Sequence, residues 1–257
     1  MKSRLLSVLL YALLLPAVLR SADAPVNGPV SIVLTYKARP EARADFRAWV
    51  ETTGAARFAA WKKEGVIADA QLLFSTFPSL ANPDLVVVLD FAHFTDTVRW
   101  REVERRFPGG LTPEALRLAS VESGNYGEPL ARALAPKRDP AKAAYLVVMY
   151  ATHVSAAEYA KYVLGYTVPQ MKEWMAAGPL TGYAMFYNNT SFNTPWDSML
   201  VMEYADLAAL TRRDEIKWAA RAKLNATDKV FKAYTDSKAS IRDDRAVFHA
   251  DAILLPQ

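Results

Sequence analysis

The chain has 257 residues, of which 52% are hydrophobic, and its 31 Lys and Arg against 27 Asp and Glu give a formal net charge of +4 at pH 7. It contains no Cys, which excludes a disulfide framework, a thiolate nucleophile and a Cys-ligated metal. The acidic residues are spread among the basic ones with no long block of like charge, so we expect no nucleic-acid partner.

The first residues have the pattern of a secretory signal peptide. Lys2 and Arg4 precede an apolar run that ends at Leu19, and Ala22–Ala24 provides a small-x-small cleavage site. Pro16 interrupts the run, which is already shorter than the roughly 20 apolar residues of a spanning helix. We therefore expect cleavage after Ala24, a periplasmic or secreted mature protein, and no membrane association after cleavage.

The mature chain opens with a strand, a helix and two more strands. Residues 30–36, about 68–75 and 85–91 are short, apolar and rich in β-branched side chains, as buried strands are. A helix begins near Pro40, where the missing N–H of proline costs nothing, and Gly65 follows its end. A second helix begins near Thr95, a short one covers about 113–118, and a strand at 128–134 closes this part.

The second half follows the same order. Strands are predicted at 144–151, 181–188 and 198–204, and Ser155 and Glu158 have the spacing of a capping box for the helix between the first two. Pro169 should kink or restart that helix, and Gly178 follows its end. A further helix begins near Asp206, a long helix is predicted over 214–240, and a last strand over 246–255.

Matched residues lie about 113 positions apart in the two halves. Trp61 and Trp174 differ by 113 in number, and the strand ending at Tyr36 matches the strand ending at Tyr150. The sequence therefore predicts a signal peptide over 1–24, a first α+β module over 25–136, a linker over 137–143 and a second module over 144–257. Each module would cover one sheet face with helices and leave the other bare, so we expect the two bare faces to close an intramolecular α+β barrel with helices outside.

This duplicated βαββ(α)β pattern, with its Tyr36/Tyr150 and Trp61/Trp174 pairs, resembles the dimeric α+β barrel superfamily of ferredoxin-like proteins. It is most similar to the tandem NIPSNAP-like and antibiotic-biosynthesis-monooxygenase-like branches. The superfamily includes cofactor-independent monooxygenases, haem-binding and haem-degrading proteins and isomerases, so the resemblance implies a fold rather than a reaction. It implies a ligand between a sheet and its helices, or inside the barrel. The Asn, Trp and His arrangement of the haem-degrading branch cannot be matched to residues of this sequence, and we expect no cofactor.

Three histidines are the candidates for acid–base or metal chemistry. His93, His153 and His249 all lie at or near predicted strands, but no spacing among them is typical of a metal site, so we expect none. A local hydrogen-bonding role is one interpretation for each. If one of them is a general base, His153 is the candidate, because it follows the first strand of the second module.

Two carboxylates occupy matching positions near the ends of strands. Asp90 and Glu203 each precede an aromatic residue and alternate with apolar neighbours, which turns them toward an apolar sheet face. One hypothesis makes them catalytic acids or bases with raised pKa values. The alternative, which buried charges usually follow, is an ion pair with a nearby Lys or Arg.

A set of aromatic residues could line the pocket of a flat apolar ligand, or could simply fill the core. The candidate ligand-binding residues are Tyr36, Trp61, Tyr150, Trp174 and Tyr183.

The leading functional hypothesis is an exported α+β barrel protein that binds a small, mostly apolar molecule, lined by Tyr150, His153, Trp174 and Tyr183. A cofactor-independent monooxygenase or isomerase with His153 as base is the first alternative, and a non-catalytic protein that forms a homo-oligomer is the second. The sequence does not decide whether the protein is an enzyme. No phosphate-binding loop and no Gly-x-Ser-x-Gly elbow is present.

Overall fold

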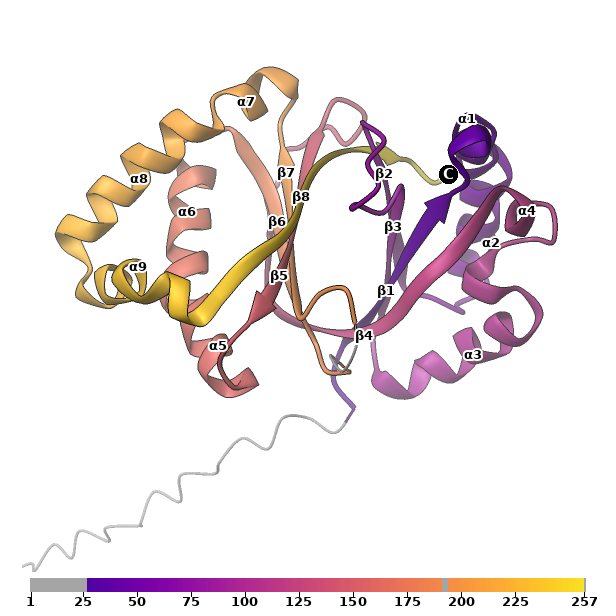
Figure 1. The fold of residues 1–257 in the computed structure, drawn as a ribbon, viewed down its shortest axis with the longest axis horizontal. Helices are drawn as coiled ribbons and strands as arrows, with labels where there is room; N and C mark the ends of the chain where they lie inside the picture. Colours follow the sequence, from indigo (N-terminus) through magenta and orange to yellow (C-terminus); the bar gives the residue numbers. More distant parts are fainter. Residues whose placement is uncertain (1–26, 191–193, 257) are drawn as a thin grey trace, which may run out of the picture.

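The computed structural model describes residues 27–190 and 194–256, so the predicted signal peptide lies outside the described residues. Eight strands form a single closed barrel in the order β1-β3-β2-β8-β5-β7-β6-β4, with every described pair antiparallel (Figure 1). The strands are β1 (Val30–Ala38), β2 (Asp69–Ser75), β3 (Leu85–Phe91), β4 (Ala119–Leu134), β5 (Ala144–Thr152), β6 (Leu180–Asn188), β7 (Ser198–Tyr204) and β8 (Arg242–Ile253). The expected α+β class and closed barrel are confirmed.

Two long strands close the barrel. The first part of β4 pairs with β1 as far as residue 127, and the remainder pairs with β6 in the other half of the chain. In the same way β8 pairs with β5 over most of its length and with β2 over residues 250–253. Both strands begin earlier than the predicted ranges 128–134 and 246–255, and this extra length lets each belong to both half-sheets.

The helices form two layers on opposite outer sides of the barrel (Figure 1). Those of the first half are α1 (Arg43–Trp49), α2 (Ala55–Lys63), α3 (Thr97–Arg106) and α4 (Ala115–Leu118), with a π-helical segment at Val50–Gly54 and 3-10 turns at Pro40–Ala42, Phe94–Asp96 and Pro108–Gly110. Those of the second half are α5 (Ala156–Tyr162), α6 (Val168–Ala176), α7 (Leu207–Thr211), α8 (Arg213–Thr227) and α9 (Lys229–Ile241), with a π-helical segment at Val163–Thr167. No helix in these described ranges has the length and apolar character to cross a bilayer.

Several predicted helix ends are present. The Ser155 hydroxyl accepts from the Glu158 backbone N–H at 3.3 Å, and the Glu158 carboxylate accepts from the Ser155 N–H at 3.1 Å, which completes the capping box. Pro169 lies in the first turn of α6, directly after the π-helical segment, so the helix restarts there. Gly65 and Gly178 have φ values of 71° and 97°, the left-handed conformation expected after a helix.

The prediction of one long helix over 214–240 is wrong, because the helix is interrupted at Asp228. This residue has extended backbone angles, and its carboxylate accepts from the N–H groups of Val230 and Phe231 at 2.9 and 3.0 Å. An aspartate that caps a new helix competes with continuation of the old one. The break folds α9 back against α8, so both helices cover the second half-sheet (Figure 1).

The buried apolar side chains fall into three groups. Tyr36 and Trp61 belong to the core between the first half-sheet and its helices, and the Tyr36 hydroxyl donates to the Gly109 carbonyl at 2.6 Å. Tyr150, Trp174 and Tyr183 belong to the equivalent core of the second half. The third group fills the barrel interior with Val33, Leu73, Val86, Val88, Tyr145, Val147, Met149, Ala184, Phe186, Trp196, Met199, Val201, Phe248 and Ala250. The middle of the barrel is therefore a packed core, and Tyr145, Ala184 and Val201 of this group also line a cavity at one end of it.

Candidate functional site

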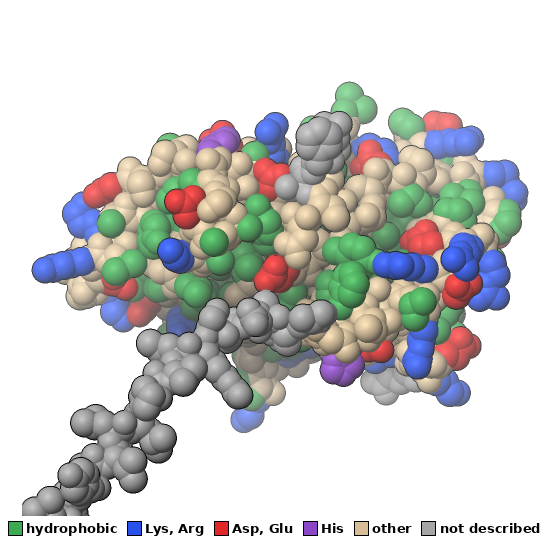
Figure 2. All heavy atoms as spheres, turned by 90° about the horizontal axis from the view of Figure 1, so that it is seen from below, with side chains coloured by type: hydrophobic (Ala, Val, Ile, Leu, Met, Phe, Trp, Pro, Cys, Tyr) green, Lys and Arg blue, Asp and Glu red, His purple; other side chains and the backbone are tan. Residues whose placement is uncertain are grey.

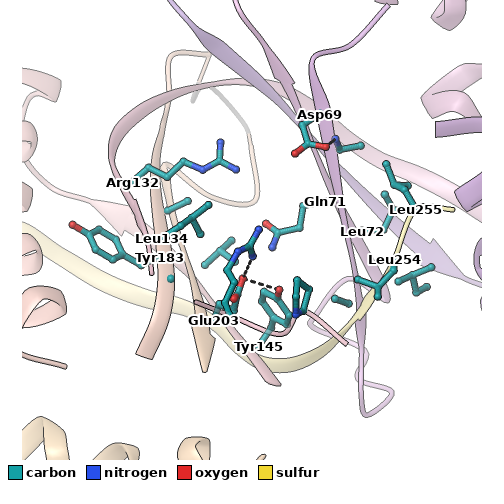
Figure 3. Close-up of a pocket in the computed structure, with 18 of the residues that line it drawn as sticks. Asp69, Gln71, Leu72, Arg132, Leu134, Tyr145, Tyr183, Glu203, Leu254 and Leu255 are labelled. Atoms are coloured by element: carbon teal, nitrogen blue, oxygen red, sulfur yellow. Dashed lines mark hydrogen bonds and ion pairs between the residues drawn. The ribbon is translucent and has the colours of Figure 1, made fainter. Parts of the chain in front are cut away.

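One cavity lies where the two halves meet at an end of the barrel; we refer to it as the joint pocket (Figure 3). It has a volume of about 210 Å³ and combines residues of β2, β6, β7 and β8 with the segment that links the halves. Leucine side chains form much of its wall, and Figure 3 shows Gln71, Arg132 and Glu203 among the polar groups around it. The lining leucines are Leu72, Leu134, Leu254 and Leu255.

Glu203 is the most buried charged group of the joint pocket, with 3% of its surface exposed. Its carboxylate accepts from the Tyr145 hydroxyl at 2.9 Å (Figure 3). It also accepts from Arg138 Nη1 at 2.6 Å and from the Thr181 hydroxyl at 3.0 Å. Burial, and then the negative charge of Glu203, raise the pKa of Tyr145, so this phenol stays protonated and keeps donating. Both carboxylate oxygens are occupied, which makes Glu203 a structural anchor between strands.

Asp90 has a similar environment in the first half. Its carboxylate accepts from Arg132 Nη1 at 2.5 Å and from the Ser31 hydroxyl at 2.7 Å. Each of the two matching carboxylates therefore lies in an ion pair with an arginine.

The three histidines lie outside the described cavities. His93 Nδ1 is 3.0 Å from the Asn27 carbonyl oxygen at the start of a 3-10 turn, and His249 is exposed on β8. His153 Nε2 is 2.9 Å from the Asp243 carboxylate, and 41% of its side chain is exposed. Among the described residues no group of three metal-binding side chains occurs. His153 therefore lies at the surface, away from the Tyr150 and Trp174 side chains that it was expected to join.

A second cavity lies between the sheet of the second half and the helices that cover it; we refer to it as the basic pocket. Its polar lining consists of Tyr150 (β5), Thr167, Gln170 and Trp174 (the π segment and α6), Arg213, Lys217 and Arg221 (α8), Lys238 (α9), and Arg242 and Asp244 (β8). Val148, Met171, Leu200, Met202 and Val247 form the apolar part of the wall.

Five of the lining residues are cationic and only Asp244 is acidic. Arg213, Lys217 and Arg221 are spaced by four residues along α8, which places them on one face of the helix. The end of α9 brings Lys238 to the same cavity, and β8 begins with Arg242. The break at Asp228 is therefore what brings the cations of α8 and α9 together.

Arg242 is the most deeply buried cation of the pocket, and it has no ion-pair partner within 4.0 Å among the described residues. Only 6% of its surface is exposed, and its Nε and Nη1 atoms have no hydrogen-bond partner among the described residues. Its guanidinium lies 3.8 Å from the ring centre of Tyr150 and 5.2 Å from that of Tyr162. The three cations of α8 are partly compensated: Arg213 and Lys217 bind Asp214 at 3.0 and 2.6 Å, and Arg221 binds the side-chain oxygen of Gln170 at 2.7 Å.

Neutral donors add to the basic pocket. The Thr167 hydroxyl and Trp174 Nε1 are buried and have no partner in the described part of the chain. Burial raises the pKa of Tyr150 to about 12, so its hydroxyl is protonated at neutral pH. The lining groups with free hydrogen-bonding capacity are thus mainly donors, and this combination is suited to an anion.

The size of the basic pocket limits what it can hold. Its volume is about 60 Å³, which is on the order of four water molecules if each needs about 15 Å³ on this measure. A carboxylate or another oxyanion with a few carbon atoms is of this size. A haem group does not fit the described residues, because a porphyrin is far larger and no His lines the cavity to bind its iron.

The sequence identified only part of this site. Tyr150 and Trp174 line the basic pocket together, whereas Tyr183 lines the joint pocket. Tyr36 and Trp61 lie in the core of the other half and do not contribute to either cavity. The cations were missed, although the four-residue spacing of Arg213, Lys217 and Arg221 was a readable sign of a basic helix face.

Comparison with known proteins identifies the fold. No protein-family model and no curated protein matches the sequence. Among solved structures, an anthrone oxidase-like protein has a TM-score of 0.55 at 10% identity, over 87% of this chain and 90% of that chain. A monooxygenase candidate from Lactobacillus acidophilus NCFM has a TM-score of 0.53 at 12% identity, over 90% and 96%. A single-residue variant of chlorite dismutase from Candidatus Nitrospira defluvii has a TM-score of 0.52 at 10% identity, over 88% and 91%.

These similarities are at the level of the whole α+β barrel. The chain has the barrel fold of monooxygenase-like and chlorite dismutase-like proteins, as the resemblance implied. At 10–12% identity the likeness shows the fold alone and transfers no reaction.

Proposed function

We propose that this protein binds a small organic anion, with a carboxylate or a similar oxyanion head group, in the basic pocket. The observation that carries the proposal is Arg242, a buried guanidinium with free Nε and Nη1 donors and no carboxylate partner among the described residues.

Electrostatics favours an anionic ligand at this position. A buried ion without a partner costs several kcal/mol even after local relaxation, and proteins normally pair such charges. Stacking on Tyr150 and Tyr162 returns only about 0.5–2 kcal/mol for each ring. An oxyanion against the fork of Arg242 would supply the missing charge and accept two parallel hydrogen bonds.

The apolar wall indicates an organic rather than an inorganic ligand. Met171, Leu200 and Met202 face the same cavity as the cations, so a few ligand carbons would be removed from water there. This modifies the expectation of a mostly apolar ligand: the ligand that fits is compact and carries a negative charge at one end.

A cofactor-independent monooxygenase or isomerase is a second candidate. Its support is the fold shared with monooxygenase-like structures, together with cations that could stabilise an enolate in the basic pocket. The expected base, His153, is paired with Asp243 at the surface, so binding is the function that the geometry favours.

The non-catalytic homo-oligomer is a weaker candidate. The filled barrel interior fits it, and Figure 2 shows hydrophobic side chains gathered over the middle of the face seen from below, among interspersed basic and acidic groups. The basic pocket, with its converging donors, favours binding instead.

We also propose that the chain is exported, with cleavage after Ala24, and that it consists of two ferredoxin-like modules at 25–136 and 144–257. The order β4-β1-β3-β2 in one half and β8-β5-β7-β6 in the other supports the second statement. A closer relation to the NIPSNAP-like or antibiotic-biosynthesis-monooxygenase-like branch is part of the same proposal and depends on the matched pairs such as Trp61 and Trp174.

Calorimetric titration with sodium butyrate, sodium benzoate and sodium sulfate, against sodium chloride at equal ionic strength, tests the proposed binding. We expect saturable binding of at least one of the oxyanions to the wild-type protein and none to Arg242→Met. Arg245→Met is the matched control, because Arg245 is exposed on the same strand and does not line the pocket. The proposal would be refuted if the wild-type protein, Arg242→Met and Arg245→Met bound the oxyanions with equal affinity, or if none of the three proteins bound any of them.

A further inference from the structure

We propose that Lys238 is a reactive amine that forms an imine with the carbonyl group of a small oxo acid, whose carboxylate binds Arg242. This inference rests on the proposed function, since it assigns a substrate class and a reaction to the same basic pocket.

The position of Lys238 suits this role. It lies in the last turn of α9, is half-buried and lines the basic pocket, four residues before Arg242. In the described part of the chain, its ammonium group has no hydrogen bond and no ion pair within 4.0 Å. It can therefore approach a ligand without breaking an existing contact.

Charged groups from several elements face Lys238. Arg242 and Asp244 come from β8, and Lys217 and Arg221 come from α8. Burial, and then the positive charges of Arg242, Arg221 and Lys217, lower the pKa of Lys238, against the opposing effect of Asp244. The unprotonated amine is consequently a larger fraction at neutral pH than for an exposed lysine, and only that form is nucleophilic.

The reaction balances with groups present in the pocket. The Lys238 nitrogen adds to the carbonyl carbon of the oxo acid, and the oxygen takes up a proton to give a carbinolamine. The carbinolamine then loses its hydroxyl as water, and a C=N bond forms, with Asp244 in the pocket to accept and return the proton. The protonated imine withdraws electrons from the adjacent carbon, so a neighbouring C–H proton exchanges, or a β-carboxylate leaves as carbon dioxide.

Reductive trapping tests the inference. The full protein is incubated with sodium pyruvate and sodium cyanoborohydride, and the modified lysines are identified by peptide mass spectrometry. We expect Lys238 to be modified on the order of tenfold faster than exposed Lys229 on the same helix, because the bound carboxylate positions the carbonyl. Butyrate, which has a carboxylate but no carbonyl, should suppress the modification of Lys238 and leave that of Lys229 unchanged.

The pH profile and two variants complete the test. Modification of Lys238 should begin at lower pH than that of Lys229, because its pKa is lowered. Lys238→Met should abolish the selective pyruvate adduct while butyrate still binds. Lys229→Met should change neither the adduct at Lys238 nor the binding of butyrate. If butyrate binds but Lys238 is modified no faster than Lys229, the imine is refuted and the proposed function stands. If none of butyrate, benzoate and sulfate binds either, both proposals fail.

Discussion

Replacement of Arg242 by methionine should stabilise the ligand-free protein while it removes anion binding. Methionine has a similar length and no charge, so Arg242→Met takes away a guanidinium that is 6% exposed and leaves an apolar side chain in its place. Buried charges that are replaced by well-packed apolar groups often leave a protein as stable as before, or more stable by about 1–4 kcal/mol.

The expected gain follows from two opposing contributions. The uncompensated burial of the charge costs several kcal/mol. Stacking over Tyr150 at 3.8 Å and Tyr162 at 5.2 Å offsets about 1–4 kcal/mol of that cost. We therefore expect the free energy of unfolding to rise by about 1–3 kcal/mol in Arg242→Met, which corresponds to an increase in Tm of roughly 2–12 °C for a chain of this size.

Urea and thermal denaturation, followed by circular dichroism in a low-salt chloride buffer, measure this difference. Butyrate should raise the Tm of the wild-type protein and leave that of the variant unchanged, because only a ligand that binds the native state stabilises it. Arg245→Met should respond to butyrate as the wild type does. A loss of more than about 2 kcal/mol in Arg242→Met without ligand would show that Arg242 is a satisfied structural residue, and would refute the reasoning.

Three further substitutions test the fold. Arg138→Met should lower the free energy of unfolding in urea by about 1–3 kcal/mol, because it leaves the buried carboxylate of Glu203 without its cation; a neutral result would mean that Tyr145 and water suffice. Met199→Ala should lower the free energy of unfolding in urea by about 2–5 kcal/mol, because the side chain is fully buried in the barrel interior. A loss of stability below about 1 kcal/mol would indicate that the barrel interior is loosely packed. Asp228→Ala should lower the free energy of unfolding by about 1 kcal/mol by removing the cap of α9, and it should weaken butyrate binding in calorimetry. Unchanged binding would argue that the cap does not hold α9 and the start of β8 in place around the basic pocket.

The comparison of sequence and structure separates local from long-range information. The strands at residues 85–91 and 198–204, the capping box at Ser155 and the left-handed glycines at 65 and 178 all depend on a few neighbouring residues, and all are present as predicted. The break at Asp228 was missed because an aspartate that follows Asn-Ala-Thr is compatible with a continuing polar helix. The helix ends there because the Asp228 carboxylate accepts hydrogen bonds from the N–H groups of residues 230 and 231.

The sequence by itself determined the α+β character, the order of elements and the apolar faces that had to be covered, because side-chain periodicity and capping are properties of short segments. Only the tertiary structure decided that β4 and β8 extend across both half-sheets, and that Glu203 and Asp90 are each bound to an arginine. It also decided that Arg242 is buried with no ion-pair partner in the described part of the chain. These features depend on which strands pair at their edges and on where distant side chains meet. The net free energy of such long-range contacts is a small difference between burial, pairing and desolvation, which no local pattern contains.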